Sequence, residues 1–405
     1  MFHTSRWDYS VTGGSPTDPS LEKLKDKRVA IIGTGATAVQ IVPHIARWAK
    51  HLYVVQRTPA AVDRRDQRET DSEWYKKEVA NSPGWQRERL RIFHQHFTTA
   101  AQPSINLVND QWTEAVSMAA VIGNPDPAAP KTMEDLPAYM KKLHAIDLPR
   151  QTAIRARAAQ IVQDPAVAEK LQAWYPTWCK RPCFHDDYLS SFNRDNVTLV
   201  DTDGKGPDSL TPDSIVVADQ KYHVDIIIFA TGFRSPLDGT PADKANLTIT
   251  GRNGVSMSQE WATHGPGTLH GVLDYNFPNL FLCGPRQASA SLSYLFGVDA
   301  LGKHSAYILK EAKLRAAGRP FAVATTKTAA EEWGTQVMMR AAPTAAIVGC
   351  TPSYMTLEGG IERVPPERQV IMARSGIWGL GIEDYLKHIE AWRAEGNLQG
   401  IEVST

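Results

Sequence analysis

The sequence predicts an α/β fold that begins with a nucleotide-binding domain. Three observations support this prediction: an apolar run at 29–32 ends in a glycine-containing turn, an amphipathic helical segment follows, and a second apolar run occupies 52–55. A buried strand, a glycine turn and a helix form the first unit of a doubly wound parallel sheet. We therefore expect a Rossmann-like domain in which helices cover a parallel sheet.

The turn itself has the spacing G-x-G-x-x-A. Gly33 permits a tight turn, Gly35 lets the backbone approach a pyrophosphate, and Ala38 is small enough for the helix to pack on the strand. The helix N-terminus then directs its N–H groups at the phosphates. This spacing also occurs in ordinary strand-helix turns, so its context decides. The expected cofactor-binding run comprises Gly33, Thr34, Gly35, Ala36, Thr37, Ala38, Val39 and Gln40.

The residues after the second apolar run indicate which nucleotide the turn binds. An NAD site carries a carboxylate about 20 residues beyond the glycines, where it holds the ribose hydroxyls. Here Gln56, Arg57 and Thr58 occupy that place. A guanidinium suits the extra 2′-phosphate of NADP, whereas a carboxylate would repel it. We predict an NADP(H) site that includes Arg57 and Thr58; the alternative for Arg57 is a solvated charge at a strand end.

Composition excludes several classes of function. Lys plus Arg and Asp plus Glu number 44 each, so no overall field recruits nucleic acid or an acidic membrane. No run approaches 18 apolar residues, and the N-terminal residues lack the apolar core of a secretory signal. The four cysteines match no zinc spacing. We expect a cytoplasmic protein with no metal, no nucleic-acid partner and no membrane span.

The stretch 61–175 turns polar and helix-like, with breaks at Pro83-Gly84, 124–127 and Pro130. Segments 85–97 and 138–146 have helical spacing, so we expect a helical insertion in the NADP domain that walls the substrate space. The pairs Arg64-Arg65 and Arg155-x-Arg157 are expected to be solvated charges.

Several motifs now make a family resemblance specific. The run His3-x-x-x-Trp7-Asp8 resembles the second half of the F-x-G-x-x-x-H-x-x-x-W-[PD] signature of flavin-dependent Baeyer-Villiger monooxygenases. The run 180–201 resembles their K-R-P…D-x-x-Y…F-N-R-x-N-V-x-L-V-D stretch, 225–233 their D-x-x-x-F-A-T-G-[FY] motif, and 277–285 their F-P-N-L-F-x-x-G-P strand. The tail from Phe321 resembles the subgroup found with fungal terpenoid and polyketide biosynthesis.

The resemblance implies an enzyme that uses FAD, NADPH and O2 to insert one oxygen into a bulky apolar ketone, giving an ester or lactone. It aligns Lys180 with a lysine at the 2′-phosphate, Arg181 with the catalytic arginine beside the flavin, and Gly284 with the strand end under the flavin ring. A helix N-terminus after Gly284-Pro285 is expected there. His3 and Trp7 would lie on the linker between the FAD and NADP domains.

Two alternatives stay open. Flavin N- or S-oxygenases of the same superfamily usually carry another aromatic residue at the Trp7 position, so Trp7 favours ketone oxidation. The second alternative is an inactive remnant that binds only NADP. It arises because the family begins with a FAD-binding β-α-β unit that has its own glycine fingerprint, and only one fingerprint occurs in these 405 residues.

The expected organisation follows from these assignments. Residues 1–20 form an interdomain linker, 21–225 the NADP-binding domain with its insertion at about 61–175, and 226–405 the remainder of the FAD domain with a C-terminal cap. The cap includes an amphipathic helix over 379–392. We expect the first FAD β-α-β to be absent, which leaves a sheet without its central strands and makes the missing FAD-binding segment a possible partner.

Overall fold

The structure is a computed structural model that describes residues 1–235 and 238–405 and contains two compact units. The first unit comprises Met1–Glu69, Asp110–Trp112 and Asp147–Arg234. The second comprises Thr70–Asn109, Thr113–Ile146 and Ser235–Thr405. The first unit therefore includes residues 1–20 and 226–234, which the sequence analysis assigned to the linker and to the FAD part.

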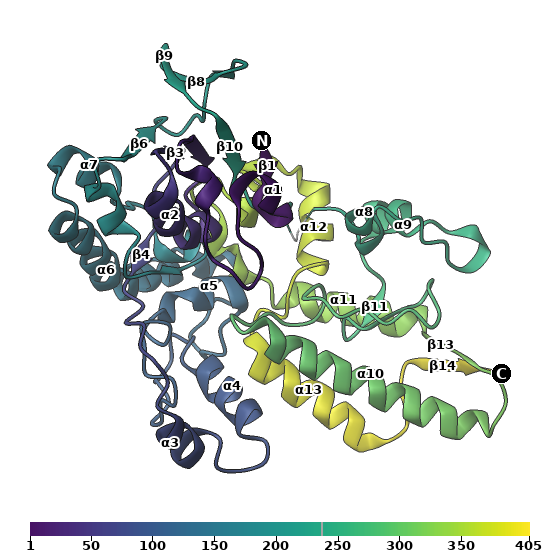
Figure 1. Cartoon of the computed structure of the whole chain (residues 1–405). Coiled ribbons are helices and arrows are strands. Elements are labelled where there is room, and N and C mark those ends of the chain that lie inside the picture. Colours follow the sequence, from purple (N-terminus) through teal and green to yellow (C-terminus); the bar gives the residue numbers. More distant parts are fainter. Residues whose placement is uncertain (236–237) are drawn as a thin grey trace. The chain divides into compact units, whose positions relative to one another are not determined.

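The first unit is built on a five-stranded parallel sheet, in which the spatial order is β1-β10-β2-β3-β6. Figure 1 shows these strands together with helix α2 (Ala36–Trp48). Alternating residues of the central strand, such as Val29 and Ile31, are fully buried among the apolar side chains of α2. This arrangement confirms the predicted parallel sheet. Its strands are β1 (Phe2–His3), β2 (Arg28–Ile32), β3 (His51–Gln56), β6 (Val197–Asp201) and β10 (Ile226–Phe229).

One ion pair fixes the start of the central pairing between β2 and β10. Asp225 accepts hydrogen bonds from the Arg28 backbone N–H at 2.7 Å and from the Arg28 guanidinium at 3.0 and 3.2 Å. The side-chain and backbone hydrogen bonds from Arg28 lower the pKa of Asp225 to about 2. Asp225 in the D-x-x-x-F-A-T-G run thus sets the register of β10 against the strand that carries the glycine turn.

The remaining elements of the first unit are the end of one long helix, two short helices and several short strands. Helix α6 (Leu136–Ile161) continues through Pro149 well beyond the predicted end at 146, and it belongs to this unit from Asp147 onward. The others are α1 (Tyr9–Thr12), α7 (Pro165–Lys170), the parallel pair β4 (Val62–Asp63) and β5 (Cys183–Phe184), and the antiparallel strands β7 (Ser209–Leu210), β8 (Ser214–Val217) and β9 (Gln220–His223).

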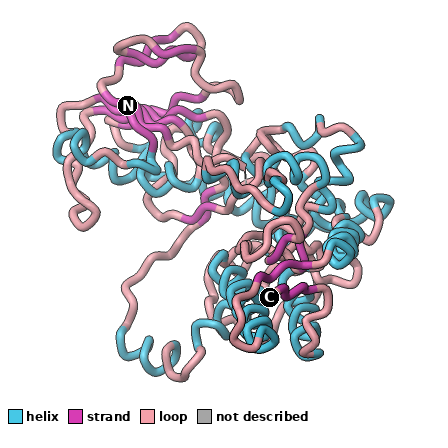
Figure 2. Tube along the Cα trace, turned by 90° about the vertical axis from the view of Figure 1, so that its right-hand side faces the viewer, coloured by secondary structure: helices cyan, strands magenta, loops and turns pink. Residues whose placement is uncertain are grey.

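The second unit is mainly helical. Helices α10 (Tyr294–Ala316) and α13 (Gly381–Glu395) lie side by side, and Figure 2 shows only short strands near the C-terminus. Its core includes Trp333 stacked on Trp378 at 4.8 Å between ring centroids. Helix α13 confirms the amphipathic helix expected over 379–392. The other elements are α3 (Ser72–Trp74), α4 (Trp85–Gln95), α5 (Ala119–Ile122), α8 (Pro241–Ala245), α9 (Met257–His264), α11 (Lys327–Met339), α12 (Pro366–Arg374), β11 (Thr268–Leu269), β12 (Leu273–Asp274), β13 (Ala322–Thr325) and β14 (Ile401–Ser404).

Most of the stretch expected as an insertion in the NADP domain packs within the second unit instead. The reason is close backbone contact with the residues that precede α13. The Asn124 N–H donates to the Gly379 carbonyl at 2.9 Å. A Cβ added to Gly123 would lie 2.6 Å from the Gly381 nitrogen, so only glycine permits this approach. The predicted helix at 85–97 is confirmed as α4.

The segment 277–285 departs from the expected strand followed by a helix. Only an isolated bridge joins Phe281 to Leu273. The backbone then turns repeatedly, with Asn279 and Gln287 at positive φ, and α10 begins only at Tyr294. The helix expected after Gly284-Pro285 is therefore α10, but its N-terminus lies nine residues beyond Pro285, because the left-handed Gln287 interrupts helical geometry.

The rest of the chain offers no transmembrane element among the residues described. Within 1–235 and 238–405, no helix combines the length and the apolar character needed to cross a bilayer.

Candidate functional site

The candidate site lies at the carboxyl end of β2 and β3 in the first unit, the edge at which open α/β sheets bind ligands. Gly33 follows β2 with a φ of +106°, and its N–H donates to the Val55 carbonyl at 2.9 Å. A Cβ at this position would lie 2.7 Å from the Ala230 carbonyl oxygen. Both the backbone conformation and the packing therefore require glycine.

Gly35 has a different surrounding. It is the N-cap of α2 with an ordinary φ of −73°, and among the described residues no heavy atom beyond its chain neighbours and its own helix lies within 4 Å of the place where its Cβ would be. The first N–H groups of α2 thus face open space, which suits an approaching anion. Ala38 and Val39 are buried in the core, while Ala36 and Thr37 stand in the first turn. Gln40 is exposed and donates from Nε2 to the Ala36 carbonyl at 2.8 Å.

Thr58 joins the glycine turn to Lys180, although 122 positions separate Thr58 from Lys180. The Thr34 hydroxyl donates to the Thr58 carbonyl at 2.7 Å. The Lys180 ammonium donates to the Thr58 hydroxyl and also lies 5.0 Å from the centre of the Tyr175 ring. Arg57, the neighbour of Thr58, is exposed. The structure therefore brings Lys180 next to the segment that carries Arg57.

Tyr175 holds this arrangement in place. Its buried hydroxyl donates to the Pro59 carbonyl at 2.9 Å and accepts the Ala61 N–H at 3.1 Å. Burial raises the pKa of Tyr175, which keeps the hydroxyl protonated for this double role. The Asp147 carboxylate supports the same segment, because it accepts the Thr177 N–H at 2.8 Å. Sequence spacing gave no signal for either contact.

Gln56 does not point toward the nucleotide. Its side chain is buried, and its Nε2 donates to the Lys170 carbonyl at 2.8 Å. Gln56 and Arg57 stand where the protein of an NAD site carries its carboxylate. Gln56 thus has a packing role, whereas Arg57 is exposed and accessible to a ligand.

Arg181 is exposed on the first unit. The backbone at Lys180, the residue before Arg181, is extended, with φ −139° and ψ 165°. The neighbouring Cys183 is buried, and burial raises the pKa of its thiol to about 12.

His3 and Trp7 have separate partners within the first unit. His3 lies with Nε2 3.1 Å from the Gly232 carbonyl, while its Nδ1 accepts the Ser5 N–H at 3.1 Å, which leaves Nε2 to donate to that carbonyl. Phe233 is 75% exposed, and its ring lies edge-on to that of His3 at 6.1 Å. Trp7 donates from Nε1 to the Thr12 hydroxyl at 3.0 Å. His3 therefore connects β1 to the turn after β10.

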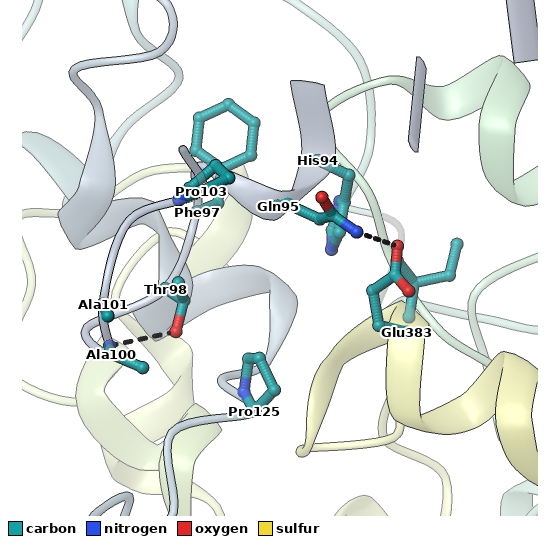
Figure 3. Close-up of a pocket in the computed structure, with 10 residues that line it drawn as sticks. His94, Gln95, Phe97, Thr98, Ala100, Ala101, Pro103, Pro125 and Glu383 are labelled. Atoms are coloured by element: carbon teal, nitrogen blue, oxygen red, sulfur yellow. Dashed lines mark hydrogen bonds between the residues drawn. The ribbon is translucent and has the colours of Figure 1, made fainter. Parts of the chain in front are cut away.

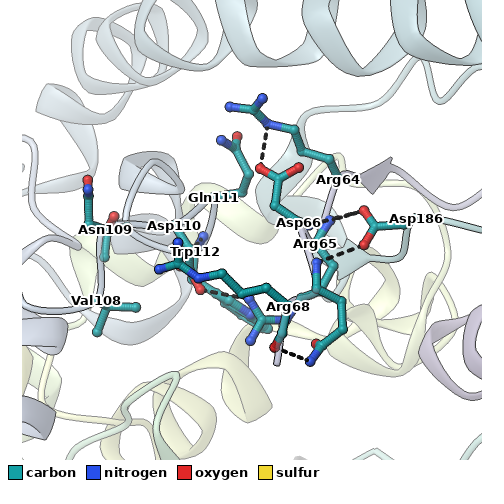
Figure 4. A network of polar contacts seen from close by, with 12 residues as sticks. Arg64, Arg65, Asp66, Arg68, Val108, Asn109, Asp110, Gln111, Trp112 and Asp186 are labelled. Atoms are coloured by element: carbon teal, nitrogen blue, oxygen red, sulfur yellow. Dashed lines mark hydrogen bonds and ion pairs between the residues drawn. The ribbon is translucent and has the colours of Figure 1, made fainter. Parts of the chain in front are cut away.

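Asp186 organises the loop after β4, as Figure 4 shows. Its carboxylate accepts the backbone N–H groups of Arg65, Asp66 and Gln67 at 2.8, 3.0 and 2.9 Å. Although burial opposes the charge, these N–H donors lower the pKa of Asp186. The expectation of a solvated Arg157 is wrong, since its guanidinium is partly buried and donates to the Val62 and His185 carbonyls at 3.3 and 3.1 Å.

Gly284 lies in the second unit, in the segment between β12 and α10. Apart from its chain neighbours, no heavy atom of the residues that the structure describes stands within 4 Å of its Cβ position, so this side of its backbone has room for a ligand. The nearby Arg286 is partly buried, and burial lowers the pKa of its guanidinium despite the carboxylates Asp238 and Asp243.

These residues fit NADP by the chemistry of their donors. The open helix N-terminus at Gly35 suits the pyrophosphate, and Lys180 with Arg57 offers two cations for the 2′-phosphate. Of the residues expected near the flavin ring, Arg181 and Phe233 are exposed in the first unit, and Gly284 is partly buried in the second. Across the described ranges, no cluster of three His, Cys, Asp or Glu side chains could hold a metal ion.

Comparison with known proteins identifies the relatives of the chain. It is 45% identical to the FAD-binding monooxygenase ausC of Aspergillus calidoustus, over all of this chain and 60% of that protein. It is also 45% identical to the polycyclic ketone monooxygenase of Thermothelomyces thermophilus, over all of this chain and 63% of that protein. The chain is a homologue of FAD-binding monooxygenases. No protein-family model matches it.

Solved structures agree with this homology. The structure of the polycyclic ketone monooxygenase matches this homologue with a TM-score of 0.95 at 45% identity, over 100% of this chain and 63% of that chain. An OTEMO complex with FAD and NADP matches with a TM-score of 0.66 at 26% identity, over 100% and 70%. A steroid monooxygenase bound to NADP shares the fold, with a TM-score of 0.70 at 23% identity over 99% and 69%. The mixed α/β fold is therefore that of flavoprotein monooxygenases, and the chain spans about three fifths of the length of the curated relatives it matches.

Proposed function

We propose that this chain acts in a Baeyer-Villiger monooxygenase that depends on FAD and NADPH. The reaction consumes a bulky apolar ketone, O2, NADPH and a proton, and it yields an ester or lactone, NADP⁺ and water. The observation that carries the proposal is the site at Gly35, Thr58 and Lys180, which suits NADP, in a chain whose homologues are FAD-binding monooxygenases. Since the relatives are named for polycyclic ketones and fungal products, we propose a role in secondary metabolism.

Each residue of the proposed site has its own role. Gly33 and Gly35 let the backbone of α2 approach the NADPH pyrophosphate, and Lys180 with Arg57 selects the 2′-phosphate. When bound, FAD supplies the redox chemistry between NADPH and O2. Arg181 keeps its charge at any working pH, so it stabilises negative charge that develops on the oxygen of the substrate carbonyl. Phe233, which is exposed in the same unit as Arg181, offers accessible surface for the flavin ring.

The test is product analysis with the FAD-loaded protein that contains this chain, supplied with NADPH and cyclic ketones of increasing size. We expect ester or lactone formation, with preference for the larger ketones. Arg181→Ala should lower the turnover number at least about 100-fold, because one oxyanion-stabilising group is typically worth this much. The control is Arg68→Ala, which removes another exposed arginine of the first unit.

The outcomes separate the alternatives. An Arg181→Ala variant that forms product at the normal rate removes the assigned role of this residue. Oxidation of amines or sulfides without conversion of any ketone assigns the protein to the N- or S-oxygenases. Binding of NADPH without any oxygenation supports an inactive NADP-binding remnant. We also propose a cytoplasmic location, which fluorescence microscopy of a tagged protein in the source cells would check.

A further inference from the structure

The second unit contains a cavity of about 320 Å³ between α4 and the start of α13. This volume lies within the range of small-molecule sites in proteins, roughly 300–1,000 Å³. Figure 3 shows Phe97 and Pro103 on one side, Pro125 below and Glu383 opposite. Most of the wall is apolar, and the polar side chains in it are His94, Gln95, Thr98 and Glu383.

His94 is the most deeply buried of the polar side chains in the cavity wall. Only 4% of its surface is exposed, and its Nδ1 lies 3.1 Å from the Ser291 hydroxyl. That hydroxyl accepts the Ser293 N–H at 3.1 Å, so its own proton is available to Nδ1. In the tautomer in which Nδ1 accepts that proton, Nε2 carries the ring proton and is a hydrogen-bond donor.

The charges around the cavity restrict the ligand. Burial lowers the pKa of His94 to about 4, so the ring is neutral near pH 7. Glu383 disfavours an anion, and the Gln95 amide directs its NH2 group to Glu383 at 3.5 Å. No Lys or Arg side chain lines the cavity in the described part of the chain. A neutral, apolar molecule that presents one hydrogen-bond acceptor matches this lining.

The geometry points to a binding site for a neutral polycyclic carbonyl compound, whose rings pack against Phe97, Pro103 and Pro125 and whose carbonyl oxygen accepts the Nε2–H of His94. The choice of a polycyclic carbonyl compound rests on the proposed function. Apolar walls with a single placed donor give affinity through burial and orientation through the hydrogen bond.

The experiment is equilibrium dialysis of the protein against androst-4-ene-3,17-dione, a four-ring diketone, without NADPH or substrate turnover. Ala101 is exposed at the cavity, so Ala101→Trp should fold and fill the space. We expect this variant to lose at least about tenfold in affinity. Its matched control, Ala128→Trp, places the same side chain at an exposed alanine outside the cavity and should bind as the unaltered protein does.

A second variant tests the hydrogen bond. His94→Phe keeps a ring at this position but removes the donor, and we expect affinity to fall about fivefold to tenfold, the usual effect of one neutral hydrogen bond. Thermal unfolding of each variant establishes that it is folded. Unchanged affinity in Ala101→Trp, or no saturable binding by the unaltered protein, would overturn the site.

The binding measurements do not depend on whether the protein oxidises a ketone. Saturable binding that Ala101→Trp abolishes supports the cavity site even when no ketone is oxidised, in which case the proposed function fails alone. Normal ketone oxidation by an Ala101→Trp protein with unchanged diketone affinity leaves the proposed function standing and overturns the cavity site.

Discussion

The Nδ1 atom of His270 lies 3.0 Å from the Nε2 atom of His304, and both rings are buried in the second unit. Burial and the neighbouring His304 lower the pKa of His270, while burial lowers the pKa of His304 to about 3. The pair is surrounded by Trp333, Trp392 and a third histidine, His388. Two neutral imidazoles share one hydrogen bond here, and neither can gain a proton without disrupting the core.

This pair predicts that acid destabilises the second unit. The unfolded chain binds protons on these histidines below pH 6.5, whereas the folded chain does not, so stability is lost as pH falls from 6.5 toward 3. From pH 7.5 to 5, His304 alone should cost about 2 kcal/mol of unfolding free energy. Urea denaturation at several pH values, followed by tryptophan fluorescence, measures this slope.

The comparison of variants isolates the histidine contribution. His304→Gln removes one of the two buried imidazoles, so this variant should show a shallower slope than the unaltered protein. Asp274 acts in the opposite sense, because burial raises its pKa to about 6 and protonation below that value relieves the buried charge. Since all variants retain Asp274, its effect cancels in the differences. Equal slopes for His304→Gln and the unaltered protein would contradict the prediction.

The two glycines of the first turn should respond differently to alanine. Gly33→Ala places a Cβ 2.7 Å from the Ala230 carbonyl oxygen at a positive φ, so we expect a clear loss of stability, roughly 1–3 kcal/mol. Gly35→Ala has an ordinary φ and open space, so it should fold normally but bind NADPH at least about tenfold more weakly, because a methyl group then stands where the pyrophosphate approaches.

Thermal unfolding and NADPH titration, performed on both glycine variants, distinguish these effects. A Gly35→Ala protein that binds NADPH normally would show that the cofactor does not lie against this turn.

Lys180 should discriminate NADPH from NADH. A charge-assisted contact with the 2′-phosphate is worth about 1.5–3 kcal/mol, or roughly one to two decades of affinity. Lys180→Ala should therefore weaken NADPH binding about 10- to 100-fold and leave NADH binding within about twofold. Fluorescence titration with both nucleotides provides the measurement, and Lys205→Ala, at an exposed lysine of the first unit, is the control. Equal affinity of the unaltered protein for the two nucleotides would refute the NADP assignment.

A polypeptide limited to these 405 residues should not retain FAD. The residues assigned to the flavin ring offer surface but no second glycine fingerprint for its pyrophosphate. The loss of several charge-assisted hydrogen bonds, at about 1.5–3 kcal/mol each, is enough to abolish retention. The absorbance spectrum of the purified, desalted polypeptide tests this, with NADPH binding as evidence of folding. A stoichiometric flavin band would contradict the prediction.

Sequence patterns predicted the local parts of this molecule well. The period of the apolar residues and the special backbone of Gly33 determine the strand, turn and helix at 28–48, and the spacing of Ile382, Tyr385 and Ile389 predicted α13. Contacts across long sequence separations were not predictable in the same way. Tyr175 with Pro59, and His270 with His304, depend on tertiary packing, for which no local pattern exists. The distance of the α10 start, Tyr294, from Gly284-Pro285 was not predictable, because turn residues at positive φ leave little trace in composition.

The pairing of β10 with β2 has a consequence for synthesis on the ribosome. Asp225 and Arg28, which align these strands, lie 197 positions apart in the chain. At roughly 5–20 residues per second, β2 waits on the order of ten to forty seconds for its neighbour to emerge. During that time one edge of β2 exposes unpaired backbone groups and apolar side chains, and these can form hydrogen bonds and apolar contacts with strands of other nascent chains. The first unit is thus a candidate client for chaperones that shield unfinished sheets until residue 229 has left the exit tunnel.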